Sequence, residues 1–427
     1  MKSLKLLAYS LVLISSIAHA ILEVTILKRD ENAFPIVISP FEVVGDTQQG
    51  RLIANIMRDN FNRSGEFNAS SSLKMITGSI DFDAWKAQGA EALVLGRIEK
   101  VSEKIFKVRI QLLDVYSQKQ LYAQEFKVHN SGIRRIAHLL SDEIYQALLG
   151  IKGSFYTRLT YITVVDKGNN EKQYRLEIAH SDAQNPQTIL TSSNPILSPT
   201  WSPDQEKIAY VSFENGRSEV FIRHPFVRRK VEKLPYFDGI ASAPTWHPDG
   251  NSLALTLSKD GNKDIYSYHL KDKKLTRLTH NAAIDTEPSY SPDGKQLVFT
   301  SNRSGQVQIY IKKLETNKIK RATYTGPYNA KAVFSPDGKS LALVHRLGRD
   351  YRIGLLDIKS KDLTILTSNQ LDESPYFSPN GNMIIFSTNK NNRGVLSVVS
   401  LIAGETVELA SKKGEVREPN WSHYSKN

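Results

Sequence analysis

Short apolar runs alternate with polar turns through the last two thirds of the chain, and this pattern repeats. Each turn is followed by four or five β-branched, aromatic or aliphatic residues, as in Lys207-Ile-Ala-Tyr-Val211 and Met383-Ile-Ile-Phe386. Runs of this kind are too short for a helix and predict buried strands. A polar turn, a third strand and a more polar fourth strand follow in most copies. Each unit is therefore expected to be a four-stranded meander.

The turns set the period of the repeat. A typical copy reads Pro288-Ser-Tyr-Ser-Pro-Asp-Gly294, in which Pro presets the first corner residue and Gly accepts the conformation that re-enters a strand. The aromatic residues of successive copies lie 43 to 45 residues apart; they are Trp201, Trp246, Tyr290, Phe334, Phe377 and Trp421. A period near 44 residues is typical of one blade of a β-propeller.

The two ends of the repeat array complement each other. Residues 155–191 carry the later strands of a blade without the turn, whereas the copy around Trp421 carries only the first strand. Pairing them would remove the exposed sheet edges that otherwise invite association with other chains. We therefore expect six blades over residues 153–427, closed by the C-terminal strand. The alternative, an open β-solenoid, would leave both edges bare.

Residues 35–152 have a different pattern, in which helices and strands alternate. The apolar residues of 47–62 recur at helical spacing, residues 106–112 and 120–128 predict a hairpin, and a second amphipathic helix is expected to be capped by Ser131. This order predicts a small mixed α/β domain. Its boundary with the propeller is expected near Gly150 and Gly153.

The first residues indicate export. A short basic segment precedes an apolar run too short to span a bilayer, and Ala18-His-Ala20 has the form of a cleavage site. We expect residues 1–20 to be a signal peptide cut after Ala20. Residues 21–34 precede the first expected strand and are expected to be a mobile N-terminal segment, because Lys28-Arg-Asp-Glu-Asn32 is strongly polar. No other apolar run is long enough to anchor the mature chain, so no stable membrane insertion is expected.

The residues required for most enzyme chemistry are missing from the sequence. There is no cysteine, no nucleophile elbow, no zinc-binding His motif and no phosphate-cradling glycine loop, so no catalytic residue, cofactor or metal is expected. The net charge of +12 is scattered and accompanies no nucleic-acid motif. His247 replaces the serine of other repeats and is interpreted as a turn variant. Glu287 and Glu373 are interpreted as equivalent acids before their prolines, with a structural or binding role.

Propeller geometry indicates where a partner would bind. The repeat turns lie on one rim, so the loops that enter the innermost strands surround the channel mouth on the opposite rim. These loops contain Ile240-Ala-Ser242, Asp285-Thr-Glu287, Tyr328-Asn-Ala-Lys331, Leu371-Asp-Glu373 and Glu415-Val-Arg417. Varied side chains on a rigid scaffold suit recognition of a protein surface or a peptide.

The whole mature chain resembles a known family. The order of signal peptide, small α/β domain and propeller is similar to that of the TolB family of the Gram-negative Tol–Pal system. Gly150-Ile-Lys-Gly153, Pro199-Thr-Trp-Ser-Pro-Asp204, Asp372-Glu373 and Pro379-Asn-Gly381 match its pattern. The resemblance implies a non-enzymatic, monomeric periplasmic adaptor that supports outer-membrane integrity and constriction during cell division.

The resemblance also implies partners. The lipoprotein Pal would bind at the channel mouth, through Ile240, Ala241, Ser242, Asp285, Thr286, Glu287, Tyr328, Asn329, Lys331, Asp372, Glu373 and Arg417. TolA would bind Ile21, Leu22, Glu23, Val24, Thr25, Ile26, Leu27 and Lys28, a segment that docks between the domains in one state and is free in the other. Colicins and other outer-membrane or murein-associated proteins are further possible partners. An exported propeller enzyme of the glycan lyase or hydrolase type, and a scaffold that binds murein directly, are the alternatives.

Overall fold

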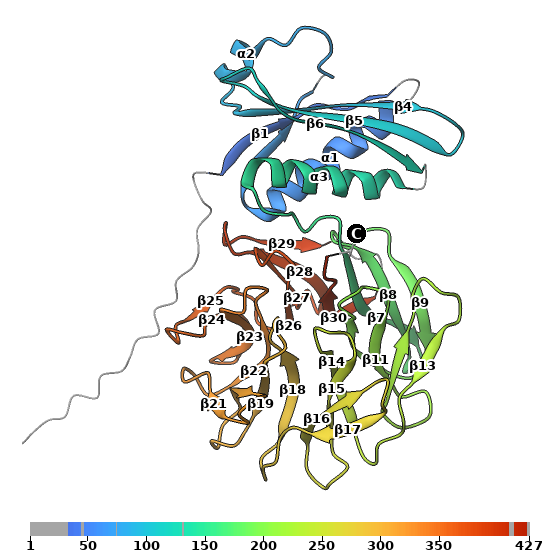
Figure 1. Ribbon diagram of the computed structural model, residues 1–427, viewed down its shortest axis with the longest axis vertical. Helices are drawn as coiled ribbons and strands as arrows, with labels where there is room; N and C mark the ends of the chain where they lie inside the picture. Colours follow the sequence, from blue (N-terminus) through green and yellow to red (C-terminus); the bar gives the residue numbers. More distant parts are fainter. Residues whose placement is uncertain (1–32, 44–46, 74, 130–131, 410–413, 425–427) are drawn as a thin grey trace, which may run out of the picture.

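The computed structural model describes residues 33–43, 47–73, 75–129, 132–409 and 414–424. An α/β part packs on one side of a β-propeller (Figure 1). The expected signal peptide with its cleavage site at Ala20, and the expected TolA-binding residues 21–28, lie outside the described residues.

The α/β part is a mixed sheet with its two long helices on one face. The strand order is β3-β1-β4-β5-β6, with β2 beside β4; β1 runs parallel to β3 and β4, and β5 and β6 form an antiparallel hairpin. Its elements are β1 (Phe34–Ile38), β2 (Glu42–Val43), α1 (Thr47–Ser64), β3 (Phe67–Ser71), α2 (Phe82–Ala87), β4 (Ala92–Lys100), β5 (Ile105–Asp114), β6 (Gln120–His129) and α3 (Ile133–Leu149). Helices α1 and α3 lie between the sheet and the propeller (Figure 1).

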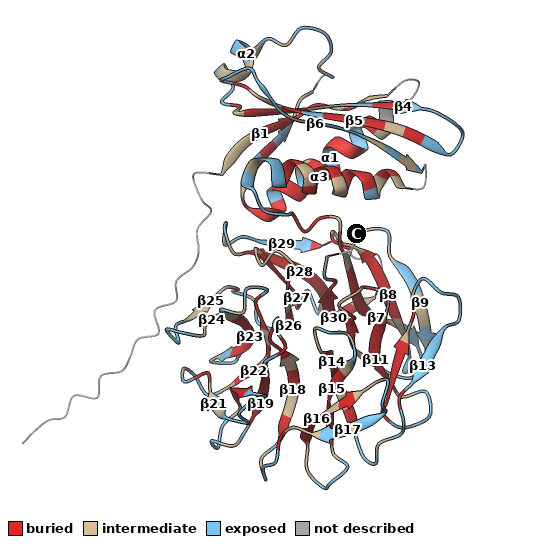
Figure 2. Cartoon of the chain, in the orientation of Figure 1, coloured by how far each residue is buried: buried red, intermediate tan, exposed pale blue. Residues whose placement is uncertain are grey.

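Both helices have the apolar face that the sequence predicted. Ile53, Met57 and Phe61 of α1 are buried, as are Ile136 and Leu140 of α3 (Figure 2). Gly132 directly precedes the first residue of α3, and the expected cap Ser131 lies outside the described residues. At the other end Gly150 adopts φ 73°, the left-handed conformation that often ends helices.

The propeller has the predicted six blades. Within the described residues, the strands between 158 and 421 form six four-stranded antiparallel sheets. Five of these sheets are each built from four consecutive strands. The first two are β10 (Ile196–Trp201), β11 (Ile208–Ser212), β12 (Glu219–Arg223) and β13 (Val231–Lys233), followed by β14 (Ala241–Trp246), β15 (Ser252–Leu257), β16 (Asp264–His269) and β17 (Lys274–Arg277). The other three are β18 (Asp285–Tyr290), β19 (Gln296–Ser301), β20 (Gln308–Lys313) and β21 (Ile319–Arg321), then β22 (Asn329–Phe334), β23 (Ser340–Leu347), β24 (Asp350–Asp357) and β25 (Leu363–Ile365), and last β26 (Asp372–Phe377), β27 (Met383–Lys390), β28 (Arg393–Ser400) and β29 (Thr406–Leu409). All six aromatic anchors of the repeat are buried.

The remaining blade joins the two ends of the array, as the sequence predicted. The C-terminal strand β30 (Glu415–Trp421) pairs antiparallel with β7 (Arg158–Gly168), which continues into β8 (Glu171–His180) and β9 (Gln187–Ser192). The buried Trp421 lies opposite Leu159 and donates from its indole nitrogen to Thr157 Oγ1 at 2.8 Å. Closure therefore depends on the last strand of the chain.

Each repeat turn is held by its own side chains. Ser291 Oγ donates to Asp293 Oδ1 at 2.6 Å and accepts from the backbone N–H of Gln296 at 2.9 Å. In the second repeat His247 Nδ1 lies 2.9 Å from Asp249 Oδ1, in the place of the serine hydroxyl. This contact supports the interpretation of His247 as a turn variant.

The α/β part and the propeller share a continuous apolar cluster. Phe155, in the segment between them, packs its ring edge-on against Phe61 of α1 and Tyr145 of α3, with ring centroids 6.1 and 5.6 Å apart. The same cluster contains Met383 and Trp421 of the propeller.

Polar contacts fix the interface as well. Asn382, in the β26–β27 turn, donates to Glu66 Oε1 at 2.8 Å and to the Tyr145 hydroxyl at 3.0 Å. Ser400 Oγ donates to the Ser64 carbonyl at 2.7 Å. The α/β part is thus seated on the rim of the repeat turns, and no part of the chain that the structure describes covers the opposite rim.

Candidate functional site

Every innermost strand of the propeller has a bulge at the same point. The register with the neighbouring strand shifts there, and one residue adopts a left-handed conformation with φ between 47° and 55°. We call these residues the bulge ring; they are Ser198, Ala243, Glu287, Lys331, Ser374 and Glu418. Five of the six precede proline, which disfavours the right-handed helical conformation. The bulge re-aims its side chain, as such irregularities do near binding sites.

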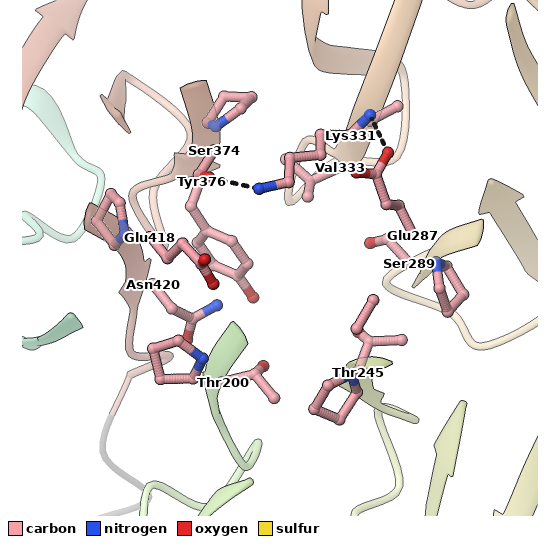
Figure 3. A pocket seen from close by; sticks show the side chains of 17 residues that line it. Thr200, Thr245, Glu287, Ser289, Lys331, Val333, Ser374, Tyr376, Glu418 and Asn420 are labelled. Atoms are coloured by element: carbon pink, nitrogen blue, oxygen red, sulfur yellow. Dashed lines mark hydrogen bonds between the residues drawn. The ribbon is translucent and has the colours of Figure 1, made fainter. Parts of the chain in front are cut away.

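The bulge ring lies at the propeller channel. A cavity of about 130 Å³ is lined by residues of all six innermost strands, including Glu287, Lys331, Ser374 and Glu418 (Figure 3). Proline and alanine residues fill much of the remaining wall. The centre of the propeller is therefore a narrow passage with few charged groups.

The charged groups of the bulge ring link adjacent blades. Glu287 Oε2 accepts from the backbone N–H of Lys331 at 2.9 Å and from Thr300 Oγ1 at 2.8 Å. The Lys331 ammonium reaches onward to Ser374 Oγ at 2.8 Å (Figure 3). Glu418 accepts in the same way from the backbone N–H of Ser198, across the closure of the propeller. These carboxylates hold neighbouring strands in place and keep negative charge in the channel.

An apolar ring surrounds the channel mouth on the uncovered rim. The residue three positions before each bulge residue is apolar in five of the six blades; we call this set the mouth collar, and it comprises Pro195, Ile240, Ile284, Tyr328, Leu371 and Glu415. The exposed fractions of Ile240, Ile284 and Leu371 are 48%, 44% and 38%. Exposed apolar residues gathered around a concave opening are typical of a protein-binding surface.

Tyr328 anchors one side of the collar. It packs edge-on against Tyr351, with ring centroids 5.5 Å apart. Burial, together with the nearby negative charge of Glu287, raises the pKa of its hydroxyl to about 12. The group therefore stays neutral at physiological pH and can offer both a ring and a hydrogen bond to a partner.

Four of the predicted mouth residues are buried side chains of the blades. Ala241, Asp285, Asn329 and Asp372 are the first residues of four innermost strands, and each is at most 2% exposed. Both Asp285 oxygens accept from Arg303 Nη2, at 2.8 and 2.7 Å. Asn329 lies 2.9 Å from Gln308 Oε1 and 2.9 Å from His345 Nδ1. In this conformation these side chains support the mouth from below and offer no surface to a partner.

Among the polar side chains of this set, Asp372 has the least complete hydrogen bonding. It accepts from Asn369 Nδ2 at 3.2 Å, and burial raises the pKa of its carboxyl above its usual range. A carboxyl of this kind belongs to the interior, where desolvation disfavours the charged form.

The other predicted mouth residues are accessible. Ile240, Glu373 and Arg417 are exposed, and Ser242, Thr286, Glu287, Tyr328 and Lys331 are partly exposed. One sequence interpretation was wrong: Glu287 is a bulge residue, whereas Glu373 precedes the bulge residue Ser374 and is equivalent to Thr286. The two acids are therefore not equivalent.

Sequence reasoning missed several channel and collar residues. Ser198, Ala243, Ser374 and Glu418 were not singled out, and neither was Ile284. The sequence signal that marks both sets is the residue before each repeat proline, together with the apolar residue three positions before it. Reading the repeats in register with one another would have found both sets.

Within the described residues, no group of three or more His, Asp or Glu side chains is arranged to hold a metal ion. Nor is any helix of that part of the chain long and apolar enough to cross a membrane. The geometry defines a class of protein: a six-bladed propeller that bears an α/β domain on one rim and exposed apolar side chains at the opposite rim.

Comparisons with known proteins agree with this class. Residues 22–121 match the TolB amino-terminal domain, and residues 145–425 match the TolB β-propeller domain. The Tol-Pal system protein TolB of Ruthia magnifica subsp. Calyptogena magnifica is 68% identical over 422 residues, covering 99% of this chain and 100% of that protein. The TolB of Nitrosococcus oceani is 48% identical and covers 99% and 98%.

A solved structure gives the same result. The crystal structure of TolB from Acinetobacter baumannii superposes with a TM-score of 0.85 at 39% identity, covering 94% of this chain and 99% of that one. The chain belongs to the TolB family of the Tol–Pal system. The relatives carry the name of a system component rather than of an enzyme, in agreement with the non-enzymatic role expected from the sequence.

Proposed function

We propose that this protein is a periplasmic adaptor that binds the lipoprotein Pal at the propeller mouth and TolA through residues 21–28. The observation that carries the first half is the mouth collar. Its residues directly precede or begin the stretch that leads into the innermost strands, three positions before the bulge ring, and Ile240, Ile284 and Leu371 are exposed. An apolar centre with polar groups around it is the usual anatomy of a protein interface.

The neighbouring charges favour a partner with mixed polar groups. Glu373 and Arg417 are exposed beside the collar, and Arg417 pairs with Glu415. Exposed pairs of this kind add little binding free energy but steer and orient a partner. We therefore assign most of the binding free energy to Ile240, Ile284, Tyr328 and Leu371, and orientation to the charged rim. Ala241, Asp285, Asn329 and Asp372 would hold the mouth in shape.

The remaining parts of the proposal rest on family membership and on the sequence. Export to the periplasm follows from the predicted signal peptide, and outer-membrane integrity and constriction are the processes that such an adaptor would serve. Pal and TolA then bind at separate places, so the protein connects them. Pal binding can alter TolA binding only if it favours one state of the N-terminal segment over the other.

The collar is tested by calorimetric titration of the mature protein with the soluble domain of Pal from the same organism. Replacing Ile240 and Leu371 together by aspartate is expected to weaken binding roughly 100-fold, because two central apolar contacts of about 1–2 kcal/mol each are lost. The matched control is Leu73→Asp, since Leu73 is 97% exposed on the α/β part. Equal affinity of the double variant and the control would refute the collar as the site, and no binding by the unaltered protein would refute the proposal.

The second half of the proposal is tested by shortening the chain. A mature protein that begins at Ala33 is expected to retain Pal binding and to lose TolA binding in the same titration, because the segment assigned to TolA is gone. The control carries Gln120→Ala, an exposed change on the α/β part outside the deleted residues. Retention of TolA affinity by the shortened protein would place that site elsewhere.

A further inference from the structure

A basic hollow lies between two neighbouring blades, away from the mouth. A cavity of about 260 Å³ has eight lining residues, and five of them are cationic. We call it the basic pocket; its cationic residues are Lys313, Lys318, Lys320, Arg321 and Lys361. No acidic residue lines it.

The two blades contribute different parts of the basic pocket. Lys313 ends β20, Lys318 lies in the turn after it, and Lys320 and Arg321 lie on β21. Lys361 comes from the β24–β25 turn of the next blade. Ile311 and Ile358 form an apolar floor. The cationic groups therefore converge on a shaped depression rather than on a flat surface.

Within the described residues, no acidic side chain forms an ion pair with a cationic residue of the basic pocket. Asp357 lies close in sequence to Lys361, but its Oδ1 accepts from the backbone N–H groups of Lys359 and Ser360, at 2.8 and 2.7 Å. Across the described residues, the ion pairs on these blades use other cations, such as Lys339 and Arg352. Arg321 donates from Nε to the Thr323 carbonyl and stacks over the Tyr324 ring.

The ammonium groups repel one another. Desolvation lowers the pKa of Lys361 and the positive charge of Lys320 lowers it further, while the negative charge of Asp357 acts in the opposite direction. An anion placed between these groups would remove the repulsion and gain several charge-assisted hydrogen bonds.

We propose that the basic pocket binds a phosphate-bearing anion. Four lysines supply compact point charges with rotatable donors, which suit the tetrahedral phosphate group, and one arginine supplies a fork for two phosphate oxygens. The hollow has room for a group the size of a diphosphate or a lipid headgroup. Both sources share this chemistry, so the experiment separates them.

The soluble source is tested by calorimetric titration of the mature protein with pyrophosphate. Lys320→Gln combined with Lys361→Gln is expected to weaken saturable one-to-one binding at least tenfold. The matched control is Lys271→Gln combined with Lys273→Gln, in the β16–β17 turn of the preceding blade, which removes the same charge from outside the pocket. The control is expected to bind within a factor of two of the unaltered protein.

The lipid source is tested by flotation of the same three proteins with vesicles that contain phosphatidylglycerol. Loss of flotation only in the pocket variant would assign the site to a headgroup, whereas pyrophosphate binding without flotation would assign it to a soluble phosphate. Equal losses in the pocket variant and the control would show only non-specific attraction to a basic protein. That result, or no saturable binding of either probe, overturns the proposal.

Discussion

Trp421→Ala is expected to lower the free energy of unfolding by about 3–5 kcal/mol, as for other large aromatic residues removed from a core. The side chain is 1% exposed, and its indole donates to Thr157. It also lies on the strand that closes the propeller, so a weakened β30 would expose the inner edge of β7. Urea unfolding followed by circular dichroism would measure the loss.

Trp246→Ala is the matched control for closure. Trp246 occupies the same place in a blade formed by consecutive strands, is also buried, and donates to the Thr200 carbonyl at 3.2 Å. Both variants should lose stability, but only the Trp421 variant should release residues 415–424 to limited proteolysis under native conditions. Equal protection of these residues in the two variants would contradict the closing role of β30.

Asp285→Ala is expected to lower the free energy of unfolding by about 3 kcal/mol. The loss arises because the substitution leaves the partly buried Arg303 without its carboxylate partner. Asp285 is 0% exposed, so the change removes an interior contact and leaves the collar surface in place. Thermal unfolding would measure the loss. Affinity for Pal, measured well below the unfolding temperature, should remain within about threefold of the unaltered protein, a difference of less than 1 kcal/mol.

Two comparisons make the Asp285 result decisive. Asp249→Ala removes an exposed turn carboxylate and should cost much less stability. Replacing Arg303 by methionine in the Asp285 variant should restore part of the loss, since the unpaired charge is gone. If Asp285→Ala instead kept full stability and abolished Pal binding, Asp285 would be a direct contact, as the sequence first suggested.

The sequence was sufficient for the architecture because its strongest signals are local and repeated. A turn such as Pro288 to Gly294 specifies its own conformation through side-chain contacts within five residues. Repetition at a period near 44 residues then specifies blades, and the incomplete first and last copies specify how the ring closes. The helices α1 and α3 could equally be predicted from the sequence, because their apolar positions recur at helical spacing.

The details of the site were harder to predict from the sequence because they depend on contacts between residues that are distant along the chain. Whether Asp285 is exposed depends on Arg303, eighteen residues away in the turn after β19, and no local pattern shows that pairing. The contacts of the bulge residues Glu287 and Lys331 likewise lie on adjacent blades, at Lys331 and Ser374.

Joining the last strand to the first blade has a consequence for how the protein is made. The ring cannot close until residues 415–421 are available, because they fill the position beside β7. During synthesis, a chain that lacks these residues can therefore form five complete blades and one unfinished blade. Its interface between the α/β part and the propeller is also incomplete, because Trp421 belongs to the shared apolar cluster. A product that stops before residue 415 lacks this strand, so it can complete neither the channel nor the domain interface. The fold thus makes possession of β30 a condition for a functional molecule.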